Sequence, residues 1–180
     1  KEAKESAAAS LDSKILPSNY EVAIELDLIS EEQEGTDRQK RLVKMREIAL
    51  QIMRILKKYK PTLIGSVWRG TSRKGSDLDI IIYHEDHSEI LRELKDFQIL
   101  STENTVFILN GVPMASNHII LNVQDFKVEI VARPTEDMEI YKNERCETYG
   151  DIKKGLKLNE LERLLKTDPL RRFVPKRKYK

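Results

Sequence analysis

The pattern of apolar residues predicts one long helix in the first third of the chain, from residue 36 or 37 to about residue 59. Apolar side chains recur there at intervals of three and four, which is the spacing of one face of an α-helix. These positions are Leu42, Met45, Ile48, Ala49, Ile52, Met53 and Leu56. We expect this face to pack against a sheet.

A shorter helix and a loop are predicted before it. Ser18, followed three residues later by Glu21, is a capping-box pattern and would start a helix over residues 20–24. Residues 31–37 are polar and include Gly35, so we expect a loop between the two helices.

Apolar and β-branched runs in the rest of the chain predict several strands. They cover residues 63–64, 78–83, 97–100, 105–109, 117–123 and 126–131. Asn110-Gly111, between two of them, is the strongest β-hairpin signal in the sequence. Two further short helices are expected, one capped by Ser88 and one capped by Asn159.

Length and composition describe a globular protein. The 180 residues suffice for one core, with 34% charged and 39% hydrophobic residues. A net charge of +2 gives no overall attraction for nucleic acid, so any basic binding surface must be local. The single cysteine, Cys146, excludes an internal disulfide and favours a reducing, cytoplasmic location. No apolar run approaches the roughly 18 residues of a membrane span, so we expect no membrane partner.

The first candidate for chemistry is the acidic pair Asp77 and Asp79 at the start of the strand over 78–83. Residues two apart on a strand face the same side, so the two carboxylates should project together. They repel each other there, and a divalent cation removes the conflict because Mg²⁺ and Mn²⁺ prefer carboxylate oxygens. The pattern therefore indicates a metal-binding edge.

The second candidate is Gly65-Ser66, where a predicted strand gives way to a helix or turn. Glycine allows the backbone to approach a ligand closely, and the N–H groups at a helix start bind phosphate. Together with the acidic pair, this predicts a nucleotide held with its metal.

These motifs resemble the DNA polymerase β-like nucleotidyltransferase superfamily. The resemblance rests on Gly65-Ser66, an Arg-Gly-Thr at 69–71, Gly75-Ser76 and the acidic-apolar-acidic triplet 77–79. Archaeal-type CCA-adding enzymes and small stand-alone nucleotidyltransferases look most similar. The resemblance implies an α+β fold, with a mixed or antiparallel sheet packed against helices on one face, N-terminal helices and a small C-terminal helical appendage.

The resemblance also implies a division of the chain. Residues 1–17 would be a flexible N-terminal segment, 18–134 the catalytic domain, and 135–180 a helical and basic appendage. The last ten residues are basic with interleaved aromatic side chains, a mixture that suits phosphate contact and base stacking but also an ordinary solvated tail.

Such enzymes take a third carboxylate from a later strand, and Glu129 matches that position. The family more often has Asp there. Asp125 is the rival, although it falls where a turn is expected. Asp77, Asp79 and Glu129 would then hold two divalent ions, Mg²⁺ or Mn²⁺, with Glu129 near the attacking hydroxyl.

The phosphate contacts implied by the resemblance come from the segment after Gly65-Ser66. Arg69 is the first candidate to stabilise charge on the triphosphate, while Arg73 and Lys74 are weaker candidates because loop cations are usually solvated. Ser76 would orient Asp77.

The predicted reaction transfers a nucleoside monophosphate from an NTP, expected to be ATP, to a hydroxyl of an RNA end, a protein or a small molecule, with release of pyrophosphate. Two alternatives stay open. One is a non-catalytic nucleotide- or RNA-binding module that keeps the fold. The other is an antitoxin-like interaction protein, which should expose an apolar face on the helix over 36–59. The oligomeric state is not predicted.

Overall fold

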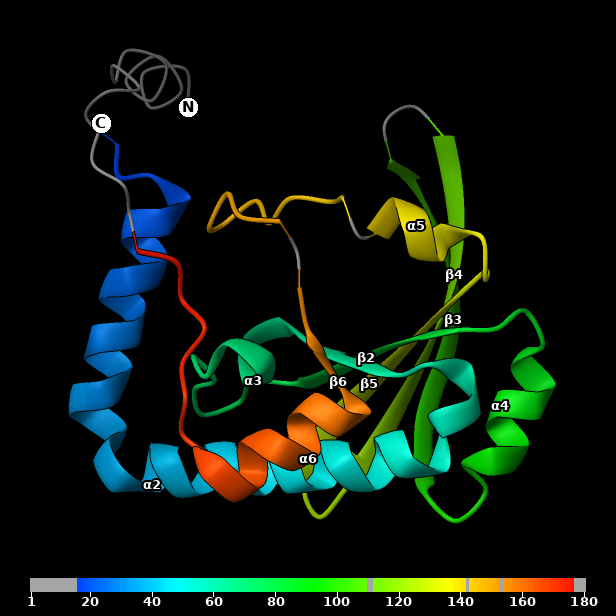
Figure 1. Ribbon diagram of the computed structural model, residues 1–180, viewed down its shortest axis with the longest axis horizontal. Coiled ribbons are helices and arrows are strands. Elements are labelled where there is room, and N and C mark those ends of the chain that lie inside the picture. The colour runs from blue at the N-terminus through cyan, green and yellow to red at the C-terminus, as the bar shows by residue number, and fades with distance from the viewer. Residues whose placement is uncertain (1–15, 110–111, 142, 153, 177–180) are drawn as a thin grey trace, which may run out of the picture.

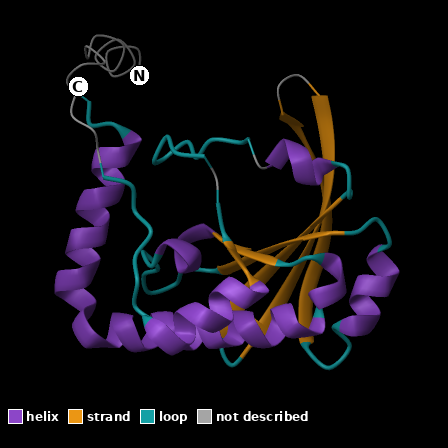
Figure 2. Ribbon diagram, viewed as in Figure 1, coloured by secondary structure: helices purple, strands orange, loops and turns teal. Residues whose placement is uncertain are grey.

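The computed structural model describes residues 16–109, 112–141, 143–152 and 154–176, which form an α+β fold with a mixed six-stranded sheet, as predicted (Figures 1 and 2). The strands are β1 Thr62–Ile64, β2 Leu78–Tyr83, β3 Gln98–Leu109, β4 Val112–Val123, β5 Phe126–Arg133 and β6 Leu156–Lys157. The helices are α2 Asn19–Ile55, the 3-10 turn η1 Lys57–Tyr59, α3 Gly65–Arg69, α4 His87–Glu93, α5 Asp137–Tyr141 and α6 Leu158–Thr167.

The sheet has the order β3-β4-β5-β2-β1-β6. Strands β2 and β5 run parallel, and the other neighbouring pairs are antiparallel. The central strand β2 therefore lies between β1, which carries Gly65 at its end, and β5, which carries Glu129. This order brings the three predicted chemical elements to one part of the sheet.

Helix α2 is longer than predicted and bent. The capping box of Ser18 and Glu21 starts it, as expected, but the loop predicted over 31–37 is wrong. Only Gly35 leaves the helical conformation, with φ 49° and ψ −130°, a backbone that suits glycine. Figure 1 shows the result as a helix that turns sharply, with its N-terminal half standing upright beside the sheet.

The bend in α2 is fixed by Arg38. Its buried guanidinium pairs with Asp27 and with Glu31, 2.7 Å away, on the other side of the bend. The same group donates to the carbonyl of Ser72, 2.9 Å away. A buried arginine that is paired and hydrogen-bonded in this way is costly to remove, so the N-terminal half of α2 is held next to the loop after α3.

The second half of α2 supplies the core. Its predicted apolar face is buried against Leu78, Ile80 and Ile82 of β2 and further apolar residues of the sheet. The face extends over Leu42, Met45, Ile48, Ala49, Ile52, Met53 and Leu56. The apolar face predicted over residues 36–59 is therefore buried, whereas the exposed apolar side chains of α2, Val22, Leu26, Leu28 and Ile29, lie in its first half.

Several smaller predictions were wrong in detail. Residues 97–100 and 105–109 belong to one strand, β3, because its pairing with β4 runs through the polar residues between them. Helix α4 is capped by the Asp86 side chain rather than Ser88, and α6 already begins at Leu158. Asn110-Gly111 lies outside the described residues; on either side of it, β3 and β4 pair as an antiparallel hairpin.

The C-terminal residues join the same body. Strand β6 pairs with β1, and α6 lies against α2 (Figure 1). Beyond α6, Arg46 of α2 donates to four backbone carbonyls, of Val67 and Trp68 in α3 and of Pro169 and Arg171 in the chain end. The boundary after residue 134 stays a prediction. Within the described residues, no helix combines the length and apolar character needed to cross a membrane.

Candidate active site

Two of the three predicted carboxylates lie side by side on the sheet. Asp79 of β2 and Glu129 of β5 are register partners in the parallel pair, and neighbouring strands are only about 4.8 Å apart. Asp77 lies immediately before β2. Asp125 falls in the turn between β4 and β5, as expected from the sequence, with a positive φ of 67°.

The carboxylates strain one another electrostatically. Burial, followed by the negative charges of Glu129 and Asp77, raises the pKa of Asp79 to about 6, with Lys127 acting in the opposite direction. A carboxyl with this pKa is only partly protonated near neutral pH. The site therefore concentrates negative charge, which a bound cation would neutralise.

Basic side chains already contact the outer two carboxylates. Lys127 Nζ lies 2.8 Å from Asp77 Oδ2, and His118 Nδ1 lies 2.6 Å from Glu129 Oε1. The other nitrogen of His118 contacts the hydroxyls of Ser116, at 2.9 Å, and Thr105, at 3.0 Å. These contacts hold the imidazole in place from the two strands β3 and β4.

Sequence reasoning did not find His118. The signal existed in the hairpin register: the tight turn at 124–125 pairs Ile120 with Glu129, which puts His118 two residues away on the same strand face. Without that register, a histidine in a predicted strand is uninformative.

The donor set fits a divalent metal in its chemistry but is not closed around one. The three carboxylates on and next to the neighbouring strands β2 and β5 provide the oxygen ligands that Mg²⁺ and Mn²⁺ prefer. The raised pKa of Asp79 marks the charge that such an ion would neutralise. As placed, Asp77 faces Lys127 and Glu129 faces His118. In the part of the chain that the structure describes, no three His, Cys, Asp or Glu side chains are grouped as a metal site.

Gly65 lies between the carboxylates and helix α3. It is the first residue of α3, and its φ of 69° is a conformation that residues with a side chain rarely adopt. A Cβ atom at this position would overlap the carboxylate of Asp79. The Gly65 backbone therefore approaches Asp79 as closely as only glycine permits, and its predicted close approach to a ligand stays a prediction.

A cavity of about 480 Å³ opens beside this contact. Four of the predicted ligand-binding residues line it: Gly65, Ser66, Arg69 and Ser76. Arg73 lines it as well, whereas Lys74 does not. The volume is in the range of pockets that bind small ligands.

The opposite walls of this cavity were not predicted. They come from the first turns of α2, including Val22, Leu26 and Asp27, and from residues 146–149, including Tyr149. Figure 1 shows the upright half of α2, α3 and the segment after α5 bordering the same region of the molecule. These residues are brought in by the bend at Gly35, where the sequence predicted a loop, and by the return of the chain after α5, which leaves no local signal in the sequence.

Arg69 is buried, and its donors are used within the protein. Its guanidinium pairs with Asp151 at 2.8 Å and donates to the carbonyl of Phe173 at 3.1 Å. It also lies 4.4 Å from the ring centres of both Trp68 and Tyr149. These contacts make Arg69 the link between α3, the segment between α5 and β6, and the chain end. Its contact with a triphosphate stays a prediction.

Ser76 and Lys74 belong to the turn before β2. The Ser76 hydroxyl accepts from the backbone N–H of Arg73 at 2.8 Å, and the backbone N–H of Lys74 donates to Glu34 at 3.1 Å. The Ser76 side chain thus closes the turn that leads into Asp77; a direct contact between the two stays a prediction.

The fold has weak similarity to several solved RNA nucleotidyltransferases. The RNA terminal uridylyl transferase Cid1 matches 52% of this chain and 30% of its own at 16% identity, with a TM-score of 0.37. The non-canonical poly(A) polymerase complex GLD-2–GLD-3 matches 66% and 41% at 17% identity and a TM-score of 0.35. A cytoplasmic RNA terminal U-transferase matches 64% and 38% at 14% identity and a TM-score of 0.35. This chain thus spans well under half of these proteins.

No curated protein matches the sequence. One family does, and it covers residues 47–147, from the second half of α2 through the sheet strands β1 to β5 and α5. The matched region includes the three carboxylates, Gly65 and Ser66. Because the match extends over more than half of the chain, the protein belongs to the family described as "Domain of unknown function (DUF4269)".

Proposed function

We propose that the protein is a metal-dependent nucleotidyltransferase, which transfers a nucleoside monophosphate from an NTP to a hydroxyl acceptor and releases pyrophosphate. The observation that carries the proposal is the position of Gly65. Its backbone meets the Asp79 carboxylate on one side and lines the 480 Å³ cavity on the other. A nucleotide in that cavity would therefore have its phosphates next to the carboxylates Asp77, Asp79 and Glu129.

The phosphates would be bound at the start of α3. Gly65 and Ser66 are the first residues of this helix. The backbone N–H groups of a first helical turn have no carbonyl partner within the helix, so they can donate to phosphate oxygens. The Ser66 hydroxyl lies at the same cavity. Arg73 is exposed and lines the cavity, so it is the side chain best placed to contact a triphosphate.

The three carboxylates would hold the metal. Asp77, Asp79 and Glu129 are its ligands in this proposal, and a bound Mg²⁺ or Mn²⁺ would lower the pKa of the acceptor hydroxyl and stabilise charge on the phosphates. Lys127 would release Asp77 when the site is loaded. Because its imidazole is held by Ser116 and Thr105, His118 would stay beside Glu129 and position that carboxylate.

A non-catalytic nucleotide-binding protein is the alternative. The pairs Lys127–Asp77 and His118–Glu129 favour it, because protein side chains that already occupy these carboxylates make a metal less necessary. The two hypotheses differ in one property: only the enzyme transfers label from the nucleotide.

The test is incubation with Mg²⁺ or Mn²⁺ and each α-³²P-labelled NTP, alone and with total RNA, with protein extract and with small-molecule extract. We expect metal-dependent release of pyrophosphate and label on one acceptor fraction, with ATP as the preferred donor. Asp79→Asn should abolish the transfer, and Asp125→Asn, an equal change in the nearby turn, should leave it intact.

The outcomes separate the hypotheses. Metal-independent nucleotide binding without any transfer would support the non-catalytic alternative. Transfer that persists in Asp79→Asn would refute the metal assignment, and no nucleotide binding at all would refute both hypotheses.

A further inference from the structure

A second cavity lies at the opposite end of the neighbouring strands β1 and β2 from the candidate active site. Its volume is about 680 Å³, and it shares no lining residue with the cavity at Gly65. Thr62 of β1 and Tyr83 of β2 line it, whereas Ile64 and Asp79, at the other ends of these strands, pair beside the candidate active site. Tyr83 follows Asp79 four positions later along β2, which corresponds to a distance of about 13 Å along the strand.

Tyr83 lines this cavity and is 8% exposed. Burial raises its pKa to about 12, so the hydroxyl is protonated and can donate. A hydroxyl donor in a cavity wall can hydrogen-bond to a ligand oxygen.

Four lysines surround the cavity: Lys57, Lys60, Lys154 and Lys157. None of them forms an ion pair within the described part of the chain. Of the two glutamates that line the cavity, Glu162 pairs with Arg54, and Glu160 accepts the backbone N–H of Lys157. The whole protein has a net charge of only +2, so this is a local concentration of positive charge.

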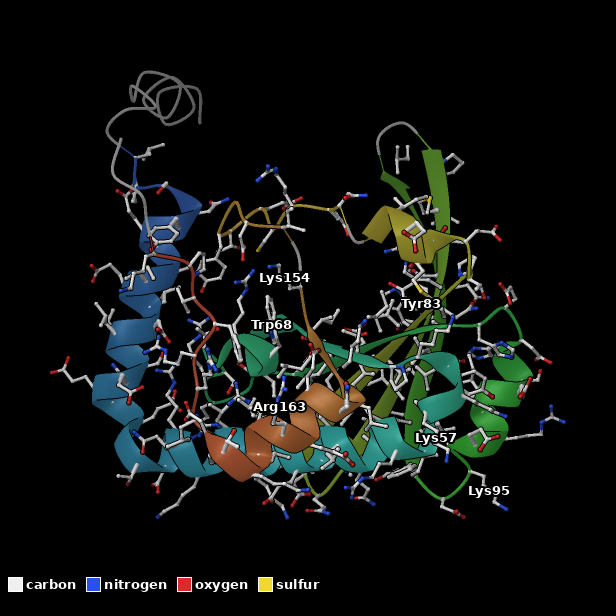
Figure 3. The ribbon with its side chains drawn as sticks, viewed as in Figure 1. Lys57, Trp68, Tyr83, Lys95, Lys154 and Arg163 are labelled. Atoms are coloured by element: carbon white, nitrogen blue, oxygen red, sulfur yellow. The ribbon has the colours of Figure 1, made fainter. Side chains whose placement is uncertain are left out.

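The remaining wall is apolar and closely built. Met138, Ile152 and Leu158 line it. Gly155 brings the segment before β6 directly onto β1, where a Cβ atom would overlap the carbonyl oxygen of Leu63 and the side chain of Thr62. Lys57, Tyr83 and Lys154, labelled in Figure 3, belong to η1, β2 and the segment before β6.

We propose that this cavity is a second binding site, for a small anionic ligand with an apolar body. The phosphate or carboxylate head would lie among the four lysines and accept the hydroxyl proton of Tyr83 in a hydrogen bond. The apolar body would cover Met138, Ile152 and Leu158. This site is independent of the nucleotidyl transfer proposed above, because the two cavities have no residue in common.

The experiment is a titration of the full chain, followed by ¹H–¹⁵N correlation spectra, with phenyl phosphate, phenylacetate and the uncharged benzyl alcohol. We expect saturable shifts in residues 57–62 and 154–160 with one or both anions and a much weaker response to benzyl alcohol. The stronger anion identifies the head group. Shifts confined to residues 65–76 would place the anion at the first cavity and overturn the proposal, as would equal binding of benzyl alcohol or no saturable binding.

Matched variants make the test specific. The double variant Lys57→Ala/Lys157→Ala should weaken anion binding about tenfold, and Tyr83→Phe about fivefold, because each removes a charge-assisted or direct hydrogen bond. Lys44→Ala/Lys95→Ala removes two exposed lysines that line neither described cavity and should change binding less than about twofold. An equal loss in this control would mean non-specific attraction to lysines and would overturn the proposal. Thermal unfolding checks that each variant is folded.

Discussion

Asp79 on β2 and Glu129 on β5 are register partners, so two acidic side chains occupy adjacent positions on parallel strands. The pairing, together with burial, raises the pKa of Asp79 to about 6. Without a bound cation, this arrangement works against folding.

Replacing Asp79 by Asn should stabilise the metal-free protein by about 1–3 kcal/mol at pH 7.5. The folded pKa of about 6 is above the ordinary value of 3.8, so the folded state favours the protonated carboxyl. Its contribution to stability is full below pH 3.8 and is lost as the pH rises through 6. The advantage of Asp79→Asn should therefore shrink between pH 7.5 and pH 4.

Urea unfolding in EDTA at these two pH values measures this effect. Asp125→Asn, in the exposed turn between β4 and β5, should change the free energy of unfolding by less than about 0.5 kcal/mol. If Asp79→Asn were less stable than the wild type at pH 7.5, the carboxylate repulsion would not be the dominant effect.

Gly65→Ala should abolish nucleotide binding and lower the free energy of unfolding by about 2–4 kcal/mol. The added methyl group meets the Asp79 carboxylate, and the backbone there has φ 69°. Gly75→Ala is the matched control: its φ is 82°, but a Cβ atom there has nothing within 4 Å. It should cost only the backbone strain, about 1–2 kcal/mol.

Nucleotide affinity and urea unfolding of the two glycine variants give the comparison. Equal losses in both variants would show that backbone strain alone explains the effect, and the close approach to Asp79 would then have no role of its own.

Arg46→Met should lower the free energy of unfolding by about 3–5 kcal/mol. The buried guanidinium, whose pKa burial lowers to about 10, donates to carbonyls of α3 and of the chain end. The substitution leaves these carbonyls without partners and releases residues 168–176 from α2. Limited proteolysis should then cut this segment first.

Arg54→Met is the control for this prediction. Arg54 lies on the same helix but is exposed, and among the described residues it pairs only with Glu162, so its loss should cost less than about 1 kcal/mol. Comparable losses in the two variants would contradict the assigned importance of the buried network.

Arg69 and Arg73 should separate into structural and ligand-binding effects. Arg69→Ala should cost about 2–4 kcal/mol of stability, because it leaves Asp151 and the Phe173 carbonyl unpaired. Arg73→Ala should weaken NTP binding about tenfold and leave stability within about 0.5 kcal/mol. A fluorescent nucleotide and urea unfolding measure the two quantities.

Lys74→Ala is the control for Arg73. Lys74 is the next residue in the same turn but does not line the cavity, so its loss should change NTP binding less than about threefold. If Lys74→Ala weakened binding as much as Arg73→Ala, the turn would act only through its general positive charge.

Much of the candidate site could be predicted from local patterns. The positions of Asp77 and Asp79 at the start of a strand, and of Gly65 between a strand and a helix, follow from residue type and spacing alone. The contact between Gly65 and Asp79 does not, because it depends on the antiparallel pairing of β1 with β2. His118 and the four-lysine cavity depend in the same way on strand register and on the return of the chain after α5.

The sequence by itself determined the elements and the chemistry that each can carry. Apolar spacing specified the buried face of α2, β-branched runs specified the strands, and the capping pattern at Ser18 and Glu21 specified where α2 starts. These signals are local, since they arise from the backbone preferences and periodicity of neighbouring residues.

Only the tertiary structure decided which of these residues act together. Gly35 bends α2 rather than ending it, and the bend, held by Arg38, brings the first turns of α2 to the cavity at Gly65. Arg69, a plausible phosphate ligand by sequence, is engaged by Asp151 from a distant segment. The physical reason is that burial and partner choice depend on contacts between residues far apart in the chain, and these exist only once the sheet and α2 have packed.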